Sequence, residues 1–152
     1  MQPTNSLKDL KNILKYSAFE SLSDSLIREI DGAYHEESKL PENSSTGGMV
    51  EVAAKYTDKW KEIADEYYDK IMDYGNSEQT DESVVMIDEL KASVSKMKTN
   101  WERYYKEQSE AYANTLYAVY NGGTILHPMI ADYKYDQQKE WALRLVSIYE
   151  QI

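Results

Sequence analysis

The chain has 152 residues, contains no cysteine and carries a formal net charge of −10. This length suffices for one domain with its own core, and the lack of cysteine excludes thiol catalysis and thiol-based redox chemistry. The excess of acids makes nucleic acid or an anionic membrane surface an unfavourable partner and a cationic protein a favourable one.

The first half of the chain predicts three helices and one loop. A helix over 6–16 carries three leucines on one face, and a second helix over 19–37 has apolar residues at similar steps. Residues 40–49 contain proline, serine and paired glycines, so we expect a loop there. A third helix over 50–74 has apolar residues spaced by three and four, and Gly75 suits a left-handed cap at its end.

The second half predicts two more helices. The fourth begins near Thr80, whose neighbours include cap-type and acidic residues, and continues to about Asn121. At ~1.5 Å per residue it is on the order of 60 Å long, so it must bend or project beyond its neighbours. Gly122-Gly123 ends it, and the last helix begins between Thr124 and Pro128.

One stripe on the fourth helix suggests how the helices assemble. Steps of three and four give a stripe without charge: Ile87, Leu90, Val94, Met97, Trp101, Tyr104, Gln108, Ala111, Thr115 and Ala118. A period near 3.5 predicts packing along most of the helix. We therefore predict a single all-α domain of about five helices, a helical bundle built on a long antiparallel helical hairpin. The third and fourth helices form this hairpin and the last helix covers it. Residues 1–39 form N-terminal helices alongside, 40–49 a loop and 50–152 the main helical region.

Acids are concentrated between Glu62 and Glu89, where ten of them accompany a single base, Lys70. Asp65, Asp69 and Asp73 share one helical face, although like charges at this spacing destabilise a helix. These acids form either a solvated face or a docking surface for a basic protein. A calcium site is the third alternative, but no loop here has the spacing of oxygen ligands that calcium requires. The candidate contact residues are Glu62, Asp65, Glu66, Asp69, Asp73, Glu78, Asp81 and Glu82.

No constellation for catalysis, a cofactor or a metal is found. His35 and His127 are the only histidines and neither forms a Glu-x-x-His pair, which argues against a di-iron or zinc site. No serine sits in a Gly-x-Ser-x-Gly turn, and the glycines after Asn121 lack the lysine of a phosphate loop. We expect both histidines at the surface, and the three tryptophans in core packing. We therefore predict that the protein is not an enzyme.

The spacing of several motifs resembles a known bacterial family. Asp65-Glu66-Tyr67-Tyr68 stands where the family has Asn-x-x-Tyr, and Leu90 leads to Trp101 with Tyr104 three residues on. Gly122-Gly123-Thr124 then fits a Gly-Gly-Thr/Ser turn, and Leu143 or Leu145 fits the final helix. In these features residues 51–152 resemble the lysozyme-inhibitor LprI-type family, small secreted helical domains of mostly unknown function.

The chain also departs from the family pattern. Lys98-Thr99 replaces the usual Gln-Arg, and Tyr105 replaces an arginine. The two cysteines of the family fall at Ser109 and near Tyr133, so both members of the pair are replaced together. The resemblance implies a protein of the bacterial envelope or periplasm that, in a few relatives, inhibits lysozyme.

Location and function follow as expectations. No apolar run approaches the ~20 residues that span a bilayer, so we expect no membrane insertion. Residues 1–6 lack the features of a signal peptide, so the chain is either cytosolic or a periplasmic or secreted form without its leader. We expect a binding protein for a cationic partner such as lysozyme. The alternative is a helical structural or adaptor module that binds a partner helix, which an uncovered apolar strip between Met97 and Tyr120 would favour.

Overall fold

The computed structural model describes residues 21–75 and 86–152, and in these two stretches the protein is an all-α bundle without strands. The all-α prediction is thereby confirmed. The expected helix over 6–16 and the start of the fourth helix near Thr80 lie outside the described residues. The elements are α2 (Leu22–Ser38), the short 3-10 helix η1 (Pro41–Asn43), α3 (Thr46–Asp73), α4 (Ile87–Tyr120) and α5 (Leu126–Gln151).

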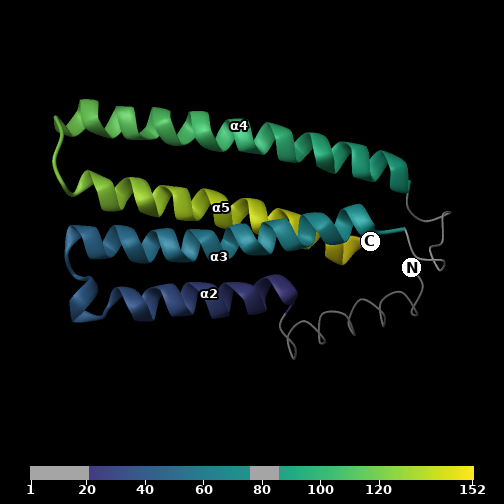
Figure 1. Ribbon diagram of the computed structural model, residues 1–152, viewed down its shortest axis with the longest axis horizontal. Helices are drawn as coiled ribbons and strands as arrows, with labels where there is room; N and C mark the ends of the chain where they lie inside the picture. The colour runs from purple at the N-terminus through teal and green to yellow at the C-terminus, as the bar shows by residue number, and fades with distance from the viewer. Residues whose placement is uncertain (1–20, 76–85) are drawn as a thin grey trace, which may run out of the picture.

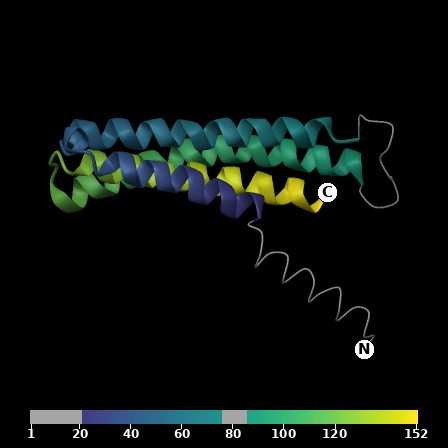
Figure 2. The same ribbon diagram turned by 90° about the horizontal axis from the view of Figure 1, so that it is seen from below.

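The four helices lie side by side as an elongated rod, in the order α4, α5, α3 and α2 (Figure 1). Consecutive helices run in opposite directions, so α3 and α5 point the same way. The most extensive packing joins α3 to α5, whereas α3 and α4 make little contact with each other. Figure 2 shows the same rod turned by 90°.

The last helix therefore occupies a different place from the one expected. We predicted that it covers a hairpin of the third and fourth helices; instead α5 lies between α3 and α4 and also reaches α2. In this position the adjacent pairs Trp141-Ala142 and Leu145-Val146 of α5 are all buried. These pairs widen the buried stripe of α5, which contacts both α3 and α4, while Glu140 and Arg144 stay exposed on its remaining face. Against α5, α3 packs Trp60 and Ile71, both fully buried.

The buried face of α4 changes partway along the helix, which corrects the predicted stripe. Val94 is buried and Trp101 half-buried as expected, but Tyr104 and the later members of the stripe (Gln108, Ala111, Thr115 and Ala118) are exposed. From Trp101 onward the buried side passes instead through Tyr105, Ser109, Tyr112 and Leu116. A straight helix has 3.6 residues per turn, so a 3.5-residue stripe drifts by ~20° per heptad. Over this helix the drift amounts to about one residue position.

The expected loop over 40–49 is wrong in its second half. Helix α3 already begins at Thr46, because the Ser45 side chain accepts a hydrogen bond of 3.0 Å from the Gly48 backbone N–H and caps the first turn. Gly48 has a further reason to lack a side chain. A Cβ at this position would lie 2.8 Å from the Cα of Asn43, so η1 can pack against the start of α3 only if residue 48 is glycine.

Substitution of the two neighbouring glycines should separate packing from helix propensity. Gly48→Ala should lower the free energy of unfolding by ~1–3 kcal/mol, because the added methyl group meets backbone that must shift. Gly47→Ala is the control: nothing lies within 4 Å of its added Cβ, so it should be neutral or stabilise by up to ~1 kcal/mol. Urea denaturation of both variants measures the difference, and equal effects would contradict the close approach of η1.

Candidate functional site

The acidic residues within the described part of the predicted surface all lie on α3 and are exposed: Glu62, Asp65, Glu66, Asp69 and Asp73. The remaining three, Glu78, Asp81 and Glu82, lie outside the described residues.

Two of the five carboxylates on α3 are paired with lysines of the same helix. Lys59 Nζ lies 4.0 Å from Glu62, and Lys70 Nζ lies 3.3 Å from Glu66. The hydrogen bond to Glu66 is also the main reason why the pKa of Lys70 is raised. Asp65, Asp69 and Asp73 form no ion pair with any residue that the structure describes. The negative potential therefore rests mainly on these three aspartates.

Asp65 and Asp69 line a groove that opens between α3 and α4. Because these two helices barely touch, a hollow of about 790 Å³ remains between them, and α5 forms its floor with Gln138 and Trp141. Asp58 belongs to the same α3 wall, and Glu102 stands on the α4 wall. The groove is a consequence of the central position of α5, which holds the two neighbouring helices apart.

Acids outnumber lysines in this groove by four to two. Lys61 and Lys98 are the two lysines, one from each wall. Lys98 is already engaged, since its Nζ lies 4.4 Å from the centre of the Tyr68 ring and 3.9 Å from Glu102. The groove therefore has a net negative charge, which comes from the aspartates of α3.

The groove continues along α5 toward the α4–α5 turn. A hollow of about 390 Å³ shares Asp58 and Tyr105 with it, and a third of about 310 Å³ shares Tyr105 and Lys134 with the second. Burial, and next the charge of Asp58, raise the pKa of Tyr105. Ser109 lines the third hollow, and its buried hydroxyl has no hydrogen-bond partner among the described residues.

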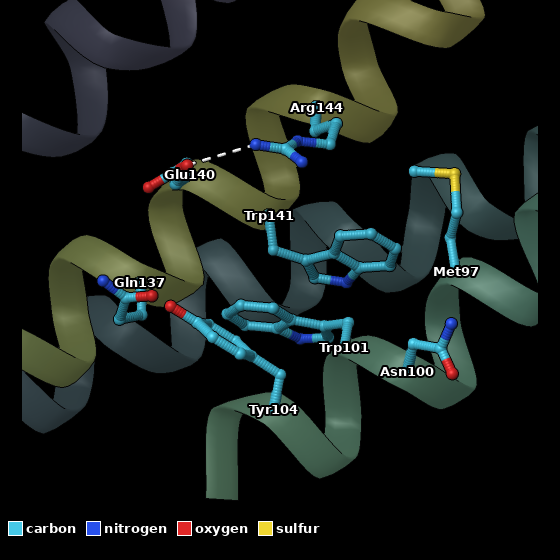
Figure 3. Close-up of a pocket in the computed structure, with 8 residues that line it drawn as sticks. All are labelled: Met97, Asn100, Trp101, Tyr104, Gln137, Glu140, Trp141 and Arg144. Carbon is cyan, nitrogen blue, oxygen red and sulfur yellow. Dashed lines mark hydrogen bonds and ion pairs between the residues drawn. The ribbon is translucent and has the colours of Figure 1, made fainter. Parts of the chain in front are cut away.

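A separate pocket of about 410 Å³ lies on the other side of α4, against α5 (Figure 3). Trp101 of α4 stacks on Trp141 of α5 with ring centres 5.5 Å apart, and Tyr104 lies beside them. Arg144 donates a 3.1 Å hydrogen bond to Glu140, so the charges on this side are already paired. Core packing was expected of all tryptophans; Trp60 and Trp141 are buried, whereas Trp101 is half-buried and borders hollows on both sides of α4.

A polar cluster that joins α2 to the rest of the bundle was not predicted from the sequence. Trp60 Nε1 donates a buried 3.0 Å hydrogen bond to the Tyr135 hydroxyl, which in turn donates to Asp31 of α2. Lys139, one turn after Tyr135, also donates to Asp31. The i, i+4 spacing of Tyr135 and Lys139 is visible in the sequence, but nothing there indicates that Asp31 lies opposite them.

The remaining predicted positions are at the surface. His35 and His127 are both exposed, as expected. In the described residues no group of three or more metal-ligating side chains gathers. None of the described helices is long and apolar enough to cross a membrane.

Comparison with known proteins adds no relative. No family model, curated protein or solved structure matches this chain. The resemblance to the LprI-type family therefore stays a prediction. Both positions at which that family would carry cysteine lie at the α4–α5 interface: Ser109 is buried there, and the ring of Tyr133 stacks on Tyr112 with centres 4.1 Å apart.

Replacing Ser109 should stabilise the fold. Ser109→Ala removes a buried hydroxyl that has no partner among the described residues, so it should raise the free energy of unfolding by about 1 kcal/mol beyond any gain in helix propensity. Ser93→Ala, at an exposed position of the same helix, measures the propensity gain alone. Thermal unfolding of the two variants gives the difference, and an equal gain would show that the Ser109 hydroxyl is satisfied.

The polar cluster should make stability depend on alkaline pH. Burial, and next the hydrogen bond to Asp31, raise the pKa of Tyr135 above its ordinary value of 10.0 in the folded chain. Its contribution is therefore complete below about pH 10 and is lost as the pH rises above that value. We expect Tyr135→Phe to lose less stability between neutral and strongly alkaline pH than the unmodified chain does.

Tyr120→Phe is the matched control for this titration, because Tyr120 is exposed. It should retain the pH dependence of the unmodified chain in urea denaturation. The same dependence in Tyr135→Phe would contradict a coupling between Tyr135 and Asp31.

Proposed function

We propose that this protein binds a cationic protein partner along the acidic side of the groove between α3 and α4. The observation that carries the proposal is the placement of Asp58, Asp65 and Asp69 on one wall of that groove, with Glu102 on the other. Following the resemblance to the LprI-type family, we propose a basic lysozyme as the partner and inhibition as the outcome. The site of action would then be the periplasm or the cell exterior.

The charges of the groove suit recognition of a basic surface. Carboxylates gathered in a hollow with partly apolar walls focus the electric field there, which speeds encounter with a cationic partner and orients it. Exposed ion pairs contribute little, so Glu62 and Glu66 should matter less than the aspartates without a lysine partner. A basic side chain entering between α3 and α4 would meet Asp65 and Asp69 with Tyr68 beside them.

The test removes charge on α3 and compares it with the same change elsewhere. The triple variant Asp65→Asn, Asp69→Asn, Asp73→Asn should weaken binding to a basic lysozyme by about tenfold or more and flatten its dependence on salt. Calorimetric titration at low and high salt measures both effects, and an assay of cell-wall lysis measures inhibition.

The control triple variant is Glu29→Gln, Glu42→Gln, Glu107→Gln, which changes the net charge equally at exposed acids outside α3 and outside the groove. It should keep most of the affinity. Equal losses in both variants would reduce the effect to overall charge, and unchanged binding by the first variant would remove the proposed surface.

One observation favours the second candidate function, a helical adaptor that binds a partner helix. Tyr117 and Tyr120, three residues apart on one side of α4, are exposed within Met97–Tyr120, the stretch where an uncovered apolar strip would suit a helical adaptor. A partner helix held by this strip would bind through apolar contact, so its affinity would be insensitive to salt and to the aspartate substitutions. The same titrations therefore distinguish the two functions.

A further inference from the structure

The groove between α3 and α4 is lined by aromatic rings as well as by carboxylates. Asp58, Asp65 and Asp69 stand along its α3 wall, about 10 Å and about 6 Å apart in the direction of the helix axis, so their carboxylates form a row. Four aromatic side chains border the same space: Tyr68, Trp101, Tyr105 and Trp141. A row of anions beside apolar rings suits a ligand whose positive charges are joined by apolar segments.

One ammonium group of the chain itself shows how the groove holds a cation. Lys98 Nζ lies 4.4 Å from the centre of the Tyr68 ring and 3.9 Å from Glu102. The ring attracts this ammonium through its π-face and the carboxylate attracts it through its charge. Asp65 and Asp69 on the opposite wall, by contrast, form no ion pair with any residue that the structure describes. They remain available to the cations of a ligand.

The floor of the groove contains a buried amide that lacks a partner. Gln138 of α5 is only 5% exposed and lines the groove, and its side chain makes no hydrogen bond with a described residue. A buried amide without its hydrogen bonds is unfavourable, so a ligand N–H that reaches the amide oxygen gains more than it would from an exposed amide. This amide therefore favours a ligand with N–H donors over a bare cation.

We propose that the groove binds a linear aliphatic oligoamine, a chain of amines joined by short methylene segments. Its ammonium groups pair with the carboxylate row of Asp58, Asp65 and Asp69, and one of its N–H groups donates to Gln138. Its methylene segments pack on the aromatic rings, and its ammonium groups gain from the ring faces. The hollow of about 790 Å³ has the size of a small-molecule site.

Other cations fit the groove less well. A metal ion would leave the rings without a contact, and the described residues form no group of three or more ligating side chains. The oligoamine site goes beyond the proposed function and does not rest on it. A small oligoamine enters the groove as a whole and needs no protein surface around it.

Calorimetric titration of the full chain with spermidine, with no other protein present, tests the proposal. Spermidine should bind at least about tenfold more tightly than hexaamminecobalt(III), which carries the same charge without a methylene chain. Asp65→Asn should weaken spermidine binding at least about fivefold, because it removes a charge from the row. Gln138→Leu should weaken it at least about threefold, because it removes the acceptor on the floor and leaves a side chain of similar size.

Asp73→Asn is the matched control, because Asp73 is exposed on the same helix but does not line the groove. It removes the same charge and should change the affinity for spermidine less than about twofold. Circular dichroism should show native helix content in all three variants.

Three results would overturn the proposal: no binding of spermidine, equal affinity for hexaamminecobalt(III), or equal losses in Asp65→Asn and Asp73→Asn. The last two would reduce the binding to general attraction between charges. Spermidine binding by a chain that does not bind a basic lysozyme would support the oligoamine site and reject the proposed protein partner. Lysozyme binding by a chain that does not bind spermidine would reject the oligoamine site alone.

Discussion

The packing of α5 against α3 is the contact on which the remaining architecture depends. Trp60 and Ile71 from α3 meet Leu145 and Val146 from α5 in one core, and all four side chains are fully buried. With α5 packed between α3 and α4, α4 is left in contact mainly with α5. The groove beside α3 and the pocket at Trp101 both follow from this arrangement, since a helix held by one neighbour leaves hollows on either side.

The attachment of α2 depends on a different kind of contact. Only Ile30 of this helix is buried in the core, while Asp31 accepts hydrogen bonds from Tyr135 and Lys139, and Tyr34 donates to Asp132 at 3.0 Å. Polar groups in a partly buried cluster stabilise only when all are satisfied. This cluster therefore fixes the position of α2 along the bundle more strictly than its apolar residues can.

The fold class and the helix ends before Gly75 and Gly122 were predictable from local signals, because periodicity and glycine turns act within a few residues, whereas the start of α3 at Thr46 was not predicted. The register of α4 was not: a 3.5-residue stripe and a straight helix agree near Val94 and separate beyond Trp101. Which helices pack against each other is also determined by distant parts of the chain. The residues around Trp141 and Leu145 therefore do not indicate that α5 lies between α3 and α4. For the candidate site, the α3 face of Asp65 and Asp69 was predictable, but the groove they line needed the arrangement of three helices.

The length of α4 separates two surfaces of opposite character. With ~1.5 Å per residue, its 34 residues extend about 50 Å. Beside its middle, at Lys98 to Tyr105, lies the acidic groove of α3, where a cationic partner gains from attraction. At its end lies the α4–α5 turn around Tyr120, where residues 111–131 carry no Asp, Glu, Lys or Arg and apolar side chains are exposed. One helix of this length therefore places an exposed apolar turn at a distance from the acids of the groove.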